Sequence, residues 1–129
     1  MGEEKMPLNM EKKRLANKNK ACMIEDRDHV VCVDPSLPVL NLIGRKYTIM
    51  IIGVIGNSGN RKNFNEVLND IPYSSSTIIS RRLRELQDFG LILRQAEAEG
   101  VTYSLTELGH DVRDALLPVM RLMERHAHE

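Results

Sequence analysis

The sequence predicts a mainly α-helical fold with a small β-hairpin, arranged as a winged helix-turn-helix domain. Two amphipathic segments, 63–71 and 75–89, are separated only by a short turn that contains Pro72. After Gly90 the apolar periodicity changes from helical to alternating, which is typical of a hairpin that follows directly. We therefore expect a single domain over residues 21–129, preceded by a charged arm over residues 1–20.

The N-terminal part of the chain changes character twice. Residues 1–20 are rich in Lys, Glu and Asn with weak periodicity, which favours a flexible or weakly helical arm. Residues 21–36 are acidic in the middle and apolar at 30–33, and a proline-containing segment then leads into a helix. From Leu37 to Ile55 the sequence is apolar on nearly all sides, so we expect one central helix. The β-branched run 49–55 is also compatible with a buried strand, but the length of the segment favours a helix.

The two helices of the helix-turn-helix have clear start and stop signals. Asn63 and Glu66 have the spacing of a capping box at the start of the first helix. The second helix is expected to be capped by Ser74 or Ser75 and to end just before Gly90. Its apolar stripe consists of Ile79, Leu83 and Leu86.

The remaining elements are a hairpin and a long final helix. Strands 91–94 and 101–105, joined by a turn over 95–100, form the wing. Thr106 is expected to cap a helix that extends to about residue 127, with Pro118 inside it. The apolar stripe of this helix is longer than a domain of this size needs, so we expect a second copy of the chain to cover it. Packing against an N-terminal helix of the same chain is the alternative.

Charge is segregated along the chain although the formal net charge is zero. Residues 45–94 contain eight basic and four acidic residues, whereas residues 95–129 contain three basic and seven acidic residues. A neutral chain with this distribution has a local positive surface around the 75–89 helix. Such a surface predicts binding to duplex DNA with modest, salt-sensitive affinity.

The outer face of the 75–89 helix offers hydroxyl groups and an arginine in its N-terminal half and no acid there, which suits the major groove. Arg81 is expected to read a base, and Arg84 to meet a phosphate. Arg82, near the apolar flank, is expected either to bond within the protein or to reach a phosphate. The alternative is that these arginines are only solvent-exposed residues of a surface helix and bind nothing. The predicted DNA-binding residues are Ser75, Ser76, Thr77, Ser80, Arg81, Arg82, Arg84, Arg94, Thr102, Lys46, Arg61 and Lys62.

Other kinds of site are not indicated by the sequence. Cys22 and Cys32 have neither a zinc nor a redox-motif spacing, so we expect small, partly buried residues, with a thiol sensor as the alternative. The four histidines form no metal-binding pattern, and no set of catalytic residues can be assembled, so neither an enzyme nor a cofactor is expected. The apolar run 47–56 is too short to span a bilayer, and no secretory signal is evident. We expect a cytoplasmic protein.

Four segments, in order and at similar spacing, resemble the HxlR-type branch of winged helix-turn-helix regulators, relatives of the MarR regulators: LNLIGRKYTIMII, RKNFNEVLNDIP, SSSTIISRRLRELQDFGLILR and VTYSLTELG. The resemblance extends from about residue 34 to residue 120. It implies a DNA-binding transcriptional regulator that is a homodimer through N- and C-terminal dimerisation helices. It also implies that helix 75–89 enters the major groove and that wing 91–105 lies along the flanking backbone.

The chain departs from the pattern of these regulators in three places. Arg45-Lys46-Tyr47 stands where the family usually has Gly-Lys-Trp. Many members carry Cys-Pro ten residues before the glycine that Gly44 matches; here that position is Asp34-Pro35, so thiol sensing is implied only by the proximity of Cys32. The wing tip is short and acidic where members often have a longer basic loop, so its base, with Arg94 and Thr102, is expected to contact the DNA backbone.

Two other functions are compatible with the same fold. One is a winged-helix module that binds protein and not DNA. The other is a redox or ligand sensor that acts through Cys32, and the sequence does not indicate which small-molecule effector it would bind.

Overall fold

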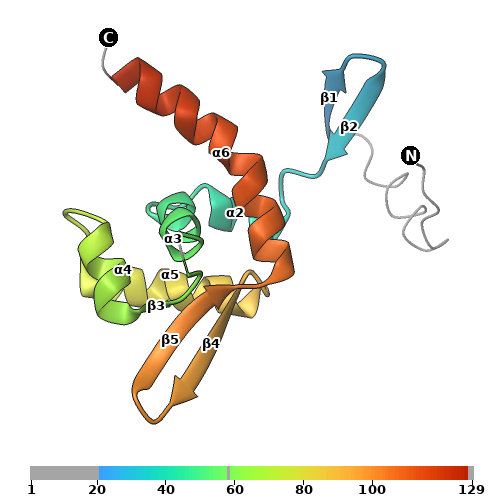
Figure 1. The fold of residues 1–129 in the computed structure, drawn as a ribbon. Coiled ribbons are helices and arrows are strands. Elements are labelled where there is room, and N and C mark those ends of the chain that lie inside the picture. Colours follow the sequence, from blue (N-terminus) through green and yellow to red (C-terminus); the bar gives the residue numbers. More distant parts are fainter. Residues whose placement is uncertain (1–20, 58, 128–129) are drawn as a thin grey trace, which may run out of the picture. The chain divides into compact units, whose positions relative to one another are not determined.

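The computed structural model describes residues 21–57 and 59–127 (Figure 1). Contacts divide the chain into two compact units, one up to Leu40 and one from Asn41 onward. The predicted arm over residues 1–20 lies outside the described residues. The described part contains five helices and two small antiparallel sheets, so the mainly helical winged fold is confirmed.

A hairpin that the sequence did not predict occupies the first unit. Strands β1 (Cys22–Asp26) and β2 (His29–Val33) are antiparallel, with Cys22 opposite Val33 and Asp26 opposite His29. Arg27 in the two-residue turn has a φ of 61°. Apolar residues lie on both faces of this hairpin and acids surround its turn, so the alternation that identifies a half-buried strand is missing from the sequence.

Two short helices replace the single helix predicted over residues 37–55, and that prediction was wrong. Helix α2 (Pro38–Ile43) ends before Gly44, and α3 (Thr48–Ile55) begins after Tyr47, whose φ of 74° is left-handed. The turn between them is held by α5, because Arg45 forms an ion pair with Glu85 and the Lys46 carbonyl accepts a hydrogen bond from Arg82. Local periodicity could not reveal these partners, which lie about 40 residues further along the chain.

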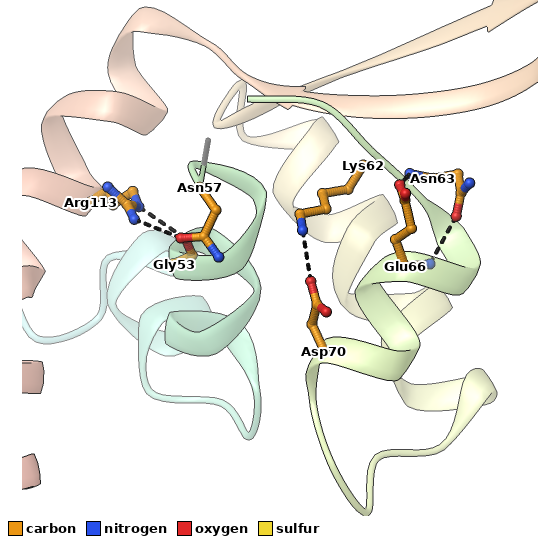
Figure 2. Close-up of polar contacts among 7 residues, drawn as sticks. All are labelled: Gly53, Asn57, Lys62, Asn63, Glu66, Asp70 and Arg113. Carbon is orange, nitrogen blue, oxygen red and sulfur yellow. Dashed lines mark hydrogen bonds and ion pairs between the residues drawn. The ribbon is translucent and has the colours of Figure 1, made fainter. Parts of the chain in front are cut away.

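The helix-turn-helix has the predicted boundaries. Helix α4 (Phe64–Asp70) begins with a reciprocal capping box, in which the Asn63 side chain accepts from the Glu66 N–H and the Glu66 carboxylate accepts from the Asn63 N–H, both at 2.8 Å (Figure 2). Helix α5 (Ser76–Asp88) is capped by Ser75, whose hydroxyl accepts from the Ile78 N–H at 3.2 Å. Both caps are confirmed.

The C-terminal end of α5 directs the chain into the wing. The Leu91 N–H donates to the Leu86 carbonyl at 2.9 Å, and the Gly90 N–H donates to the Gln87 carbonyl at 3.0 Å. This is a Schellman motif, and it requires the left-handed backbone that Gly90 adopts at a φ of 75°. Leu86 and Leu91 are both buried, which is the apolar contact that usually accompanies the motif.

The wing is a three-stranded antiparallel sheet in the order β3-β5-β4, made of β3 (Lys62–Asn63), β5 (Gly100–Leu105) and β4 (Ile92–Glu97). Figure 1 shows β4 and β5 extending away from the helices of this unit. Only Ala98 and Glu99 lie between β4 and β5, so the turn is shorter than the predicted 95–100. The short turn places Arg94 opposite Tyr103. The two-residue strand β3 is too short to produce any periodic signal.

Helix α6 (Glu107–Ala127) continues through Pro118. Its predicted cap is confirmed, since the Thr106 hydroxyl accepts from the Gly109 N–H at 3.0 Å and donates to the Gly90 carbonyl at 2.6 Å. Arg113 joins α6 to α3 by donating to the Gly53 carbonyl at 3.0 Å and to the Asn57 side chain at 3.1 Å (Figure 2).

A continuous apolar core holds the second unit together. It takes residues from every helix from α2 to α5 and from both long strands of the wing, with Val112 and Leu116 of α6 packed against it. Its buried members are Leu42, Ile51, Ile52, Ile55, Val67, Ile71, Ile79, Leu83, Leu86, Leu91, Ile92 and Leu105. None of the helices in the described part of the chain is both long enough and apolar enough to cross a membrane.

Candidate nucleic-acid interface

Helix α5 has one face in the core and one face in solvent. Ile79, Leu83 and Leu86 are buried on the inner side. The side chains on the other side are exposed, and those in its N-terminal half carry hydroxyl groups or a guanidinium group: Ser76, Thr77, Ser80 and Arg81. This exposed surface contains no acid until Asp88, in the last turn of the helix.

Glu85 is not part of the exposed face of α5. Its side chain is 22% exposed and interacts with two arginines: Arg45, across the turn before α3, and Arg82, one helical turn away at 3.1 Å. Its negative charge is therefore compensated within the protein. The potential above the outer face of α5 is correspondingly more positive than the sequence suggests.

Arg82 takes the first of its two predicted roles, bonding within the protein. Its Nε donates to the Lys46 carbonyl at 3.0 Å, and its Nη1 donates to Glu85 at 3.1 Å. The side chain is only 12% exposed. Arg82 therefore ties α5 to the turn between α2 and α3.

Arg81, Arg84 and Arg94 are in a different situation from Arg82. All three are exposed, and within residues 21–57 and 59–127 none of them forms a hydrogen bond or an ion pair. Arg81 and Arg84 lie one turn apart on α5, and Arg94 lies on β4. Guanidinium groups without internal partners are free to bind phosphates or guanine bases.

An open groove of about 390 Å³ separates α5 from the wing. It is polar, and both guanidinium groups and hydroxyl groups face it. The lining residues are Ser80, Leu83, Arg84, Gln87, Asp88, Arg94 and Tyr103. Two guanidinium and two hydroxyl groups in one groove match the donors that commonly bind DNA phosphates. Sequence reasoning missed Gln87 and Tyr103 as site residues; the short wing turn, which sets Tyr103 opposite Arg94, was the signal that could have revealed Tyr103.

Thr102 does not join Arg94 in this groove. Adjacent residues of a strand point to opposite faces, and Thr102 is paired with Gln95 and Asn63 on the face away from Arg94 and Tyr103. Thr102 is also half-buried, because β5 is the central strand of the sheet.

The three predicted contacts outside α5 and the wing hairpin differ in their surroundings. Arg61 donates to Gln95 at 2.9 Å and lies 3.8 Å from Glu97, so it interacts with the wing. Lys62 forms a 2.9 Å ion pair with Asp70 (Figure 2). Lys46 is exposed, with its ammonium group 5.1 Å from the centre of the ring of the neighbouring Tyr47.

Both cysteines are exposed free thiols, so the expectation of partial burial was wrong. Cys22 faces Val33 across the hairpin and Cys32 faces Met23, which puts the two thiols on opposite faces. Within residues 21–57 and 59–127, no group of three or more His, Cys, Asp or Glu side chains could hold a metal ion.

Comparison with known proteins decides the family. The model of the HxlR-like helix-turn-helix matches residues 42–129, which include α3 to α6 and the whole wing. This chain belongs to the HxlR-like helix-turn-helix family. The HxlR-like family consists of transcriptional regulators, and the chain is accordingly a DNA-binding transcription regulator.

Solved structures agree with this assignment. The crystal structure of a possible HxlR family transcriptional factor from Thermoplasma volcanium GSS1 is 42% identical, with a TM-score of 0.80, and the match covers 84% of this chain and 99% of that one. The reduced form of the transcriptional regulator YodB from B. subtilis is 31% identical, with a TM-score of 0.53, covering 70% of this chain and 89% of YodB. No curated protein matches this chain.

Proposed function

We propose that this HxlR-like regulator binds duplex operator DNA sequence-specifically as a homodimer, with α5 in the major groove and the β4–β5 wing along the flanking backbone. The observation that carries the proposal is the distribution of unpaired charge. Among the residues that the structure describes, Arg81, Arg84 and Arg94 have no partner, and they lie on α5 and the facing strand, whereas Glu85 and Asp70 nearby are each paired with another cation. A positive, hydroxyl-rich surface next to a helix N-terminus fits DNA better than it fits a protein partner.

The exposed residues of α5 and its N-cap are proposed to have two roles, which are reading base edges and binding phosphates. Ser76, Thr77, Ser80 and Arg81 lie in the leading half of the helix, the part that reaches base edges when a recognition helix enters the major groove. Ser75 uses its oxygen lone pair to cap the helix, which leaves its hydroxyl proton available for a phosphate oxygen.

Arg84 and Arg94 are proposed to hold one phosphate between them. They line the groove between α5 and the wing together with the hydroxyl groups of Ser80 and Tyr103. Asp88, the last residue of α5, also lines this groove and would repel a phosphate, so the phosphate is expected toward Ser80.

A second copy is proposed to cover the C-terminal half of α6. Val119, Leu122 and Met123 are between 45% and 52% exposed, and Met50 of α3 is 55% exposed. An apolar groove of about 530 Å³ lies between α6 and the segment 43–50, with methionines on both sides. Methionine side chains adapt their shape to a partner, and a symmetric pair of such surfaces gives a twofold dimer.

The test is the selection of fragments bound by the full chain from the source genome. We expect enrichment of inverted half-sites whose centres lie one or two helical turns apart, because a twofold dimer presents two α5 helices to one side of the duplex. Uniformly weak binding to all fragments would contradict the proposal and would favour the alternative of a module that binds protein.

A further inference from the structure

The turn between α4 and α5 contains an aromatic residue with an exposed side chain. Tyr73 has a relative exposure of 101%, and its φ of 65° lies in the left-handed region. Bulky residues rarely adopt that backbone conformation, whereas glycine and asparagine adopt it readily. Tyr73 therefore combines an unfavourable backbone with a side chain that is fully exposed among the described residues.

Tyr47 has the same unfavourable backbone conformation as Tyr73, but core packing of its ring compensates for it. Its φ of 74° is also left-handed, but its ring is half-buried and packs against the core. Its hydroxyl donates to the Tyr73 carbonyl at 3.2 Å, and the Ser74 hydroxyl donates to the Ile71 carbonyl at 2.7 Å. These two hydrogen bonds hold the turn through its backbone. Within the described ranges, the Tyr73 hydroxyl forms no hydrogen bond of its own.

The position of Tyr73 indicates a ligand for its ring. It lies two residues before Ser75, the N-cap of α5. Tyr73 is therefore next to the N-terminal end of α5, which is proposed to enter the major groove. A residue just before that end lies at the edge of the groove, where the sugar-phosphate backbone passes. A tyrosine suits this place, because its ring can pack on a deoxyribose and its hydroxyl can donate to a phosphate oxygen.

We propose that Tyr73 is a DNA-contact residue that packs on the backbone of each half-site and donates a hydrogen bond to a phosphate. The contact positions the leading end of α5 without reading a base, so it acts alike at every sequence. This inference rests on the proposed DNA-binding function.

The test compares variants of the full chain on a selected fragment by fluorescence anisotropy. Tyr73→Gly and Tyr73→Asn both accept a positive φ, so their Tm is expected to equal or exceed that of the native chain. Their affinity is expected to fall about tenfold on specific and unrelated DNA alike, because they lose both a hydrogen bond to a charged group and the packing of the ring. The slope of log affinity against log salt should stay constant, because no charge is lost. Tyr73→Phe, which keeps the ring, should lose only part of the affinity.

Arg81→Ala on the same fragment is the control that separates the two proposals. If Arg81→Ala weakens binding while both Tyr73→Gly and Tyr73→Asn bind within about twofold of the native chain, the Tyr73 contact is overturned and the proposed function stands. If Arg81→Ala and Arg84→Ala also bind as the native chain does, the proposed function has failed, and the Tyr73 contact fails with it. A lower Tm for both Tyr73 variants would show that the ring serves the fold and would also overturn the inference.

Discussion

Arg82 and Arg84 lie two positions apart on α5, and the fold gives them opposite surroundings. Arg82 is nearly buried and donates to Glu85 and to the Lys46 carbonyl, whereas Arg84 is exposed and lines the groove beside the wing. Two residues along a helix correspond to a rotation of about 200°, so Arg82 and Arg84 lie on nearly opposite sides of the helix and reach different environments. Identical side chains should therefore respond differently to the same substitution.

We expect Arg82→Ala to lower the free energy of unfolding by about 2 kcal/mol, because it removes hydrogen bonds to a half-buried carboxylate and to a carbonyl. Arg84→Ala should leave the unfolding midpoint unchanged and should reduce the salt slope of DNA binding by about one. Denaturant unfolding and salt titrations measure the two quantities. The reverse outcome, a stable Arg82→Ala and an unstable Arg84→Ala, would contradict the assignment of roles.

The two cysteines make a second prediction at this scale. Cys22 and Cys32 lie on opposite faces of the β1–β2 hairpin, so one hairpin cannot join them. Treatment with diamide, which oxidises two thiols to one disulfide, should therefore link two chains. Non-reducing electrophoresis should show a covalent dimer for the native chain and for either single Cys→Ser variant, and none for the double variant. A monomer that migrates faster because of an internal disulfide would contradict the hairpin.

At the scale of elements, the helix-turn-helix and wing were predictable because their signals are local. The Asn63–Glu66 capping box, the Ser75 cap and the left-handed Gly90 each act within a few residues of the boundary that they set. The break between α2 and α3 was not predictable, since it depends on Glu85 far along the chain. The same holds for the groove, whose lining comes from α5 and from both wing strands.

The junction of α6 with the wing gives a prediction for an element. A Cβ added to Gly109 would overlap the carbonyl oxygen of Leu91, which belongs to the backbone and cannot move aside easily. We expect Gly109→Ala to lower the free energy of unfolding by about 1–3 kcal/mol through overpacking. His110→Ala, at the exposed neighbouring position, is the matched control and should unfold like the native chain. Equal stability of Gly109→Ala and the native chain would contradict this close approach.

At the scale of the whole molecule, a chain with no net charge has a locally positive surface because paired and unpaired charges are separated. Glu85, Asp70 and Glu97 are each close to a cation of their own, whereas Arg81, Arg84 and Arg94 have no partner within the described part of the chain. The segregation of charge along the chain is visible in the sequence, but only the tertiary structure shows which cations are already paired.

The proposed dimer is tested on the exposed stripe of α6. Leu122→Glu and Met123→Glu place a charge on a surface that a partner would bury, so we expect sedimentation to show monomers of these variants and a dimer of the native chain. DNA affinity should fall as well, since a monomer contacts only one half-site. Arg121→Glu adds an acid at an adjacent exposed position outside the apolar stripe and should remain dimeric. A dimeric Leu122→Glu would place the interface elsewhere.

An anisotropy titration of Arg81→Ala on a selected fragment tests whether the outer face of α5 reads DNA. Arg121→Ala, an exposed arginine of α6, is the charge-matched control. We predict that Arg81→Ala loses about 1–3 kcal/mol of binding free energy and relaxes specificity at one base position, while Arg121→Ala binds like the native chain. Equal binding by Arg81→Ala and the native chain would contradict it.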